Sequence, residues 1–288
     1  MKTSPLSKNN WLERVVLAIL FVILGTAIMY VFNPWGSGTV LPEVYDYLAK
    51  IGVCIVLLAA AFLAKQSLRF QRYWLILFGL FILTLTVTLD LVFGIYYIKY
   101  LNFQQPTPAS IAFQKLNEAF VVLSVVVGCT LASGNHLGSI YIQKGKLKLG
   151  LLIGLIAFLL AAASSLPMAA LFKSQNLTIA RVLPWIPWVL IFVLSNATLE
   201  ELLFRGLFLR KLEPFFGKFF SNLLVAIVFT LMHGAVTYTV DQYMFLAILF
   251  PLALLWGYIM QTTDGIWASI LFHAGMDIPV ILSIFSTL

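Results

Sequence analysis

Charged residues are scarce in this chain of 288 residues. Only 10% of them are Asp, Glu, Lys or Arg, whereas 61% are hydrophobic. Soluble domains carry about 25% charged residues, so this composition excludes an ordinary water-soluble globular protein. The sequence therefore predicts a protein that has the lipid bilayer as its solvent.

Cysteine is also scarce, because the chain has only two. Cys54 and Cys129 lie in apolar stretches without a partner at metal-ligand spacing, which excludes a disulfide framework and a cysteine-based metal site. The net charge of +7 would suggest nucleic acid in a soluble protein. Here the cations occupy short segments between apolar runs, so we expect no nucleic-acid partner and leave the oligomeric state open.

What the chain has in abundance is apolar runs of about 20 residues, the length that a transmembrane helix needs. We predict an all-α polytopic bundle of about eight to nine spans, with a longest polar connection at 99–118. We expect two transmembrane domains, residues 1–180 with about five spans and residues 181–288 with the remaining spans. The expected spans are 15–32, 50–64, 74–98, 119–137, 149–172, 184–209, 221–238, 242–260 and 266–286.

Lysine and arginine predict the orientation, because short cytoplasmic loops retain positive charge. Their distribution places the N-terminus in the cytoplasm and, with nine spans, the C-terminus outside. We expect a multi-pass protein of a prokaryotic cytoplasmic membrane. The cations assigned to the cytoplasmic side are Lys2, Lys8, Arg14, Lys65, Arg69, Arg72, Lys144, Lys146, Lys148, Arg210, Lys211 and Lys218.

Ionisable side chains interrupt the last apolar helices, although a charge at the bilayer centre costs about 2.5 to 3.5 kcal/mol on insertion scales. Glu201 lies four residues before Arg205, so the two share a helix face and are expected to form a supporting ion pair. Glu200 is rotated by about 100° from Glu201 and has no such partner. It is therefore the candidate for chemistry.

Two histidines complete the candidate site. Counted along their helices, Glu200, His233 and His273 lie roughly 12 to 18 Å below the cytoplasmic surface, so they can meet at one level. As ligands, the three could hold Zn²⁺ with an open position for water. Without metal, Glu200 and His233 could polarise water while His273 and Asp277 stabilise the intermediate. An ionised Asp277 only accepts hydrogen bonds, which favours it as the residue that orients His273.

These residues resemble the CAAX protease and bacteriocin-processing family (CPBP, or Abi). The resemblance covers roughly residues 184–282 and implies that the second domain, residues 181–288, is the catalytic one. It rests on three motifs in order: Glu200-Glu201-x-x-x-Arg205, Phe229-x-x-x-His233 and His273-x-x-x-Asp277. It implies an intramembrane endopeptidase of glutamate or metal type, whose eukaryotic relatives remove the last three residues of prenylated CAAX proteins on the cytoplasmic side.

The resemblance also implies a role for each motif. Glu200 with His233 would activate water, Glu201 would be structural, and His273 with Asp277 would stabilise the intermediate. Many family members have Asn where this chain has Asp277. An Asp side chain lacks the amide N–H with which Asn can donate a hydrogen bond. The expected substrate is a membrane-tethered protein or peptide, prenylated in a CAAX-type case.

Two other functions fit the same helices. A noncatalytic membrane scaffold or bacteriocin-immunity protein would keep the fold without the reaction. A proton-coupled transporter would also place acids and histidines inside the membrane. Transport would require a polar path through both leaflets, whereas the expected cluster lies toward one side and the sequence has no inverted repeat.

Overall fold

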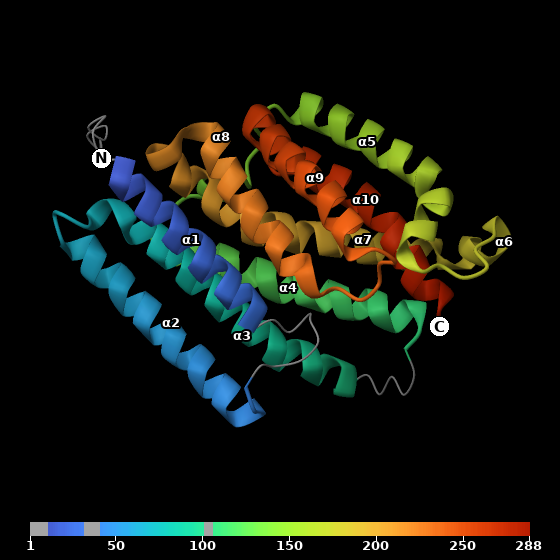
Figure 1. Ribbon diagram of the computed structural model, residues 1–288, viewed down its shortest axis with the longest axis horizontal. Coiled ribbons are helices and arrows are strands. Elements are labelled where there is room, and N and C mark those ends of the chain that lie inside the picture. Colours follow the sequence, from blue (N-terminus) through green and yellow to red (C-terminus); the bar gives the residue numbers. More distant parts are fainter. Residues whose placement is uncertain (1–10, 32–40, 101–105) are drawn as a thin grey trace.

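The computed structural model describes residues 11–31, 41–100 and 106–288. This part of the chain is helical and has no β-strand, which confirms the predicted all-α bundle (Figure 1). Its α-helices are α1 (Trp11–Val31), α2 (Glu43–Gln66), α3 (Trp74–Tyr100), α4 (Pro108–Ala132), α5 (Leu147–Met168), α6 (Ile179–Val182), α7 (Ile186–Glu201), α8 (Leu207–Met232), α9 (Gln242–Thr263) and α10 (Trp267–Ser286). Short turns of 3₁₀-helix and one π-helix, η5 (Leu202–Gly206), connect or extend them.

Eight helical elements of the described chain are long and apolar enough to cross a membrane, and the longest has 57 residues, Ile179–Ala235. That element folds back on itself at Gly217, whose φ of 71° and ψ of 176° are not helical. A straight helix would separate Phe204 from Phe229 by about 37 Å. Their ring centroids are 5.1 Å apart. The element therefore makes two antiparallel passes, in agreement with the predicted count of nine.

The predicted connection over 99–118 was wrong. Helix α3 extends to Tyr100 and α4 begins at Pro108, well inside the expected loop. A capping box starts α4: the Ser110 amide donates to Thr107 Oγ1 at 3.1 Å and the Thr107 amide donates to Ser110 Oγ at 2.8 Å. Pro108 at the first helical position needs no amide partner. The polar residues that follow therefore lie on a helix.

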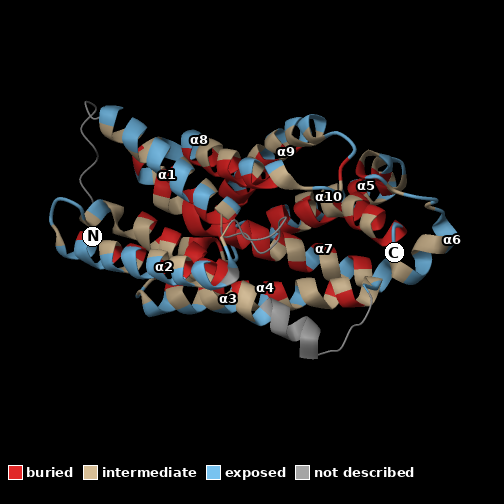
Figure 2. Cartoon of the chain, turned by 60° about the horizontal axis from the view of Figure 1, so that its bottom comes forward, coloured by how far each residue is buried: buried red, intermediate tan, exposed pale blue. Residues whose placement is uncertain are grey.

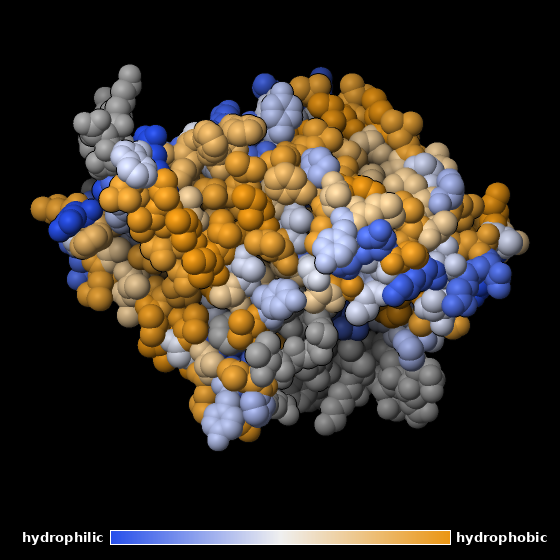
Figure 3. Space-filling model, in the orientation of Figure 1, coloured by the Kyte–Doolittle hydropathy of each residue, from blue (hydrophilic) through white to orange (hydrophobic). Residues whose placement is uncertain are grey.

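The core lies where α7, η5, α8 and α10 meet, and the outer helices α1, α2 and α5 keep large apolar side chains exposed (Figure 2). Apolar residues also dominate the face of the molecule seen in Figure 3. In water such a surface would be unstable, whereas lipid tails accept it. The burial pattern and the apolar helices together identify an integral membrane protein.

Small residues allow α5 and α10 to pack closely. A Cβ atom on Gly154 would lie 2.8 Å from Leu271 Cβ, and one on Gly275 would lie 2.8 Å from Phe158 Cα. Small residues at such interfaces are how membrane helices bring their backbones together. This contact fixes α10, the helix that carries two of the predicted site residues.

Candidate active site

The first acidic motif lies where α7 passes into the π-helix η5. Glu201 and Arg205 are fully buried, and Arg205 Nη1 donates to Glu201 Oε1 at 2.9 Å. Arg205 also donates to the Ala253 carbonyl at 3.2 Å and lies 4.1 Å from the centre of the Phe229 ring. The ion pair expected from helical spacing is thus present, and it holds the core of the bundle together.

Glu201 also orients His273. His273 Nδ1 lies 2.8 Å from Glu201 Oε1, and Ser269 donates to the other carboxylate oxygen. An ionised carboxylate only accepts, so Nδ1 carries the hydrogen and Nε2 faces away from Glu201. The Trp256 ring stacks on the imidazole with centroids 4.0 Å apart and planes at 12°. His273 therefore has a fixed tautomer and a fixed plane.

This arrangement differs from the expectation that Asp277 orients His273. Asp277 Oδ1 lies 3.6 Å from Nε2, and its Oδ2 accepts from Asn196 Nδ2 at 3.0 Å. The i,i+4 spacing placed His273 and Asp277 on one face, but it could not reveal an acceptor on another helix. The orienting carboxylate belongs to Glu201, on α7.

Glu200 faces the opposite nitrogen of the same imidazole. Its Oε2 lies 3.5 Å from His273 Nε2 and has no hydrogen-bond partner in the described part of the chain. Helical phase predicted this separation, in which Glu201 is bound by Arg205 and Glu200 is not. A buried acceptor without a partner is rare and is a natural position for a water molecule or a substrate.

His233 follows directly after α8, in the 3₁₀ turn His233–Ala235. Its Nδ1 lies 2.9 Å from the Phe229 carbonyl oxygen, which can only accept, so Nδ1 is the donor. Gln242 holds the turn by donating to the His233 carbonyl at 2.7 Å. In the neutral ring, Nε2 is then the basic nitrogen, and the side chain lines the same cavity as Glu200.

An ion pair between neighbouring helices helps to bring Glu200 and His273 to the same level. Arg210 and Asp264 form an ion pair that fixes the C-terminal end of α9 beside the first part of α8. At the helical rise, Glu200 lies about 15 Å before Arg210 and His273 lies about 9 Å beyond the start of α10, and the two side chains come within 3.5 Å of each other. The common level predicted for Glu200 and His273 is therefore present, and His233 reaches their cavity from the end of α8.

A cavity of about 450 Å³ lies in front of these residues. Its volume is within the range of about 300 to 1,000 Å³ that small-molecule sites occupy. Most of its wall is apolar, with Phe172, Phe245 and Leu252 among the lining residues. The polar lining residues are Gln114, Lys115, Glu118, Asn196, Glu200, His233, Tyr238, Thr239, His273 and Asp277.

Sequence reasoning missed the contribution of α4 to this wall. Gln114, Lys115 and Glu118 were assigned to an external loop, whereas they lie on one helix face, where Glu118 accepts from the other two. Their spacing of three and four residues was a signal for a helix face. The cavity therefore draws on both of the predicted domains.

The cavity extends toward one end of the bundle. Phe172 and Thr239, from the connections after α5 and after α8, are part of its wall. These connections lie at the opposite end from the basic segments around Lys146 and Lys218, because α5 and the second pass of α8 start at the basic end. Figure 1 shows the two ends, with the N-terminus at one and the C-terminus at the other.

The predicted zinc set was Glu200, His233 and His273. The part of the chain that the structure describes has no group of three or more His, Cys, Asp or Glu side chains placed to hold a metal ion. Glu201 binds His273 Nδ1, as carboxylates do beside metal-binding histidines, so Nε2 is the nitrogen of His273 that would face a metal. The zinc ion stays a prediction.

Fold and site together define a class, a polytopic helical membrane protein with a buried glutamate and histidine centre beside a cavity. Residues 182–279 match the model of the family described as type II CAAX prenyl endopeptidase Rce1-like. The match includes all three motifs and confirms, for this segment, the CPBP family predicted from them. It supports a CAAX-type intramembrane endopeptidase in general. No curated protein and no solved structure matches the chain.

Proposed function

We propose that the chain is an intramembrane endopeptidase that hydrolyses a peptide bond of a membrane-tethered protein or peptide, with water activated by Glu200 and His233. The observation that carries the proposal is the Glu200 carboxylate. Its Oε2 is buried without a hydrogen-bond partner among the described residues, 3.5 Å from His273 Nε2, in the wall of the cavity.

The reaction follows from the donors and acceptors of the site. Glu200 takes a proton from water as general base, with the basic Nε2 of His233 as the second acceptor, and the hydroxide attacks the carbonyl carbon. In its imidazolium form, His273 donates from Nε2 to the resulting oxyanion. Glu200 then gives its proton to the nitrogen that leaves as the C–N bond breaks. Glu201 keeps His273 in place throughout.

The cavity wall supports an amphiphilic substrate. Its aromatic and aliphatic side chains suit an apolar peptide or a prenyl group, whereas the paired Lys115 and Glu118 on α4 offer polar contacts to the peptide backbone or its C-terminus. A CAAX-type substrate has both of these parts, and the family supports that class. Cleavage at the cytoplasmic face stays a prediction from the charge pattern. The cavity extends toward the end of the bundle opposite the basic segments, which favours entry of the substrate from the non-cytoplasmic side.

One experiment separates this function from its rivals. Purified protein is incubated with farnesylated and unprenylated peptides, and its zinc content is measured alongside. We expect Glu200→Gln and His233→Gln to lower kcat by about 10² to 10⁴ with unchanged thermal unfolding. Glu213→Gln is the matched control, because this carboxylate accepts from Tyr141 and Gln261 outside the cavity.

The rival functions predict other results. Hydrolysis that survives both substitutions would refute the mechanism, and a folded wild-type protein that cleaves neither peptide would favour the scaffold or immunity function. Proton-coupled transport has less support, because the site polar groups gather around one cavity near one end of the bundle.

A further inference from the structure

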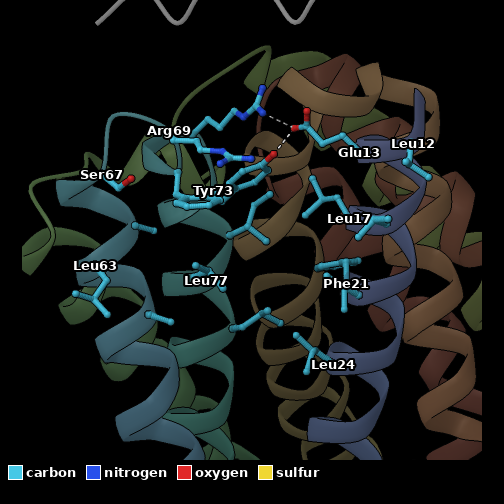
Figure 4. A pocket seen from close by; sticks show the side chains of 18 of the residues that line it. Leu12, Glu13, Leu17, Phe21, Leu24, Leu63, Ser67, Arg69, Tyr73 and Leu77 are labelled. Carbon is cyan, nitrogen blue, oxygen red and sulfur yellow. Dashed lines mark hydrogen bonds and ion pairs between the residues drawn. The ribbon is translucent and has the colours of Figure 1, made fainter. Parts of the chain in front are cut away.

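A second cavity, of about 1170 Å³, lies in another part of the molecule, between α1 on one side and α2 and α3 on the other (Figure 4). It shares no lining residue with the first cavity. Leucine and phenylalanine side chains cover most of its length, such as Leu17 and Phe21 from α1, Leu63 from α2 and Leu77 from α3. We call this cavity the α1–α3 groove.

The groove is apolar along its length and basic at one end. There Arg72 pairs with Glu13 at 2.9 Å, and the Tyr73 hydroxyl donates to the same carboxylate (Figure 4). Arg69 also lines this end. It is exposed, its guanidinium lies 5.4 Å from the centre of the Phe70 ring, and it has no acidic partner in the described ranges. Arg69 and Arg72 carry two positive charges and Glu13 carries one negative charge, so these three side chains together make this end of the groove positive.

The length of the groove matches one leaflet. Along α1, the lining runs from Trp11 to Leu24, and the part between the charged Glu13 and Leu24 is about 16 Å long at the helical rise. The hydrocarbon core of a bilayer is about 30 Å thick, so the groove spans about half of it. Its charged end lies with the basic connection between α2 and α3, on the side that the charge pattern assigns to the cytoplasm.

We propose that the α1–α3 groove binds an anionic phospholipid, with an acyl chain along the leucine wall and the headgroup phosphate on Arg69 and Arg72. Arginine suits this role because its planar guanidinium binds phosphate oxygens in pairs. Anionic lipids attract basic segments at the cytoplasmic surface. The helices leave room for such a lipid, because α1 packs on α8 and α3 and α2 packs on α3, with the groove lined by α1, α2 and α3.

Delipidated protein in neutral detergent provides the test, with native mass spectrometry and thermal unfolding as readouts. We expect phosphatidylglycerol to bind and to raise Tm, and phosphatidylcholine with the same acyl chains to do neither. Arg69→Gln should weaken phosphatidylglycerol binding about fivefold, because a basic residue near the surface contributes about 1 kcal/mol. Ala60→Trp, which fills the groove wall, should abolish binding without a loss of Tm in lipid-free detergent.

Lys148→Gln is the matched control, because Lys148 is exposed at the same end of the bundle but lies outside the groove. Its binding should equal that of the wild type. Equal binding of both lipids, or full binding by Arg69→Gln, would overturn the proposal. So would a dimer that Ala60→Trp converts to a monomer, since a second copy would then occupy the groove. Lipid binding is measured without substrate, so its outcome does not depend on proteolysis.

Discussion

The ion pair between Glu201 and Arg205 allows the sharpest prediction, because both side chains are fully buried. Replacing Arg205 with Met keeps a long apolar side chain in the core and leaves the Glu201 carboxylate without its cation. The Arg205 bond to the Ala253 carbonyl and the guanidinium contact with Phe229 are lost as well. Arg205→Met should therefore destabilise the bundle far more than a change of shape alone.

The magnitude follows from this burial. Removing one partner of a buried ion pair costs about 3 to 5 kcal/mol, because the remaining charge is uncompensated. The double variant Glu201→Gln, Arg205→Met removes both charges of this pair, so it should cost at least about 2 kcal/mol less than Arg205→Met alone. Glu200→Gln removes no hydrogen bond seen in the described residues, so its effect on stability should be small.

Reversible unfolding in mixed detergent and dodecyl sulfate micelles measures these differences directly. The four proteins, wild type included, are compared under one condition. A cost of less than about 1 kcal/mol for Arg205→Met, a value typical of exposed pairs, would refute the reasoning. A double variant less stable than Arg205→Met would refute it too.

Two further predictions concern packing and topology. A Cβ atom on Gly257 would lie 1.9 Å from Asn222 Oδ1, so Gly257→Ala should cost about 1 to 3 kcal/mol in the same unfolding assay, and Asn222→Ala should relieve part of that cost. Val240 and Lys144 are exposed at opposite ends of the bundle. In a cysteine-free background, a membrane-impermeant maleimide should label Val240→Cys on intact cells and Lys144→Cys only after lysis. The reverse pattern would overturn the orientation predicted from charge.

Local patterns in the sequence predicted the features that depend on a single helix. Hydropathy predicted the spans, and helical spacing predicted the pair between Glu201 and Arg205 and the separate orientation of Glu200. The turn at Gly217 follows from the same spans, since two passes need a reversal between them.

Patterns within one helix could not predict contacts between residues of different helices. The acceptor of His273 Nδ1 is Glu201, 72 positions away, and nothing in the spacing of either helix indicated it. The start of α4 was missed because polarity was taken as the signal of a loop. Polar side chains such as Gln114 and Lys115 can lie within a transmembrane helix when they face a cavity. Hydropathy averaged along the sequence cannot show which side chains face a cavity and which face lipid.

The face of α4 that borders the site has a consequence for how such a protein can change over evolutionary time. The groups that we propose to break the peptide bond all come from the matched segment 182–279, whereas Gln114, Lys115 and Glu118 come from outside it. Under the proposed function, substitutions on α4 would alter which substrate is accepted while the reactive residues stay the same. One chemical centre can in this way serve many substrates, each defined by the helix that stands opposite.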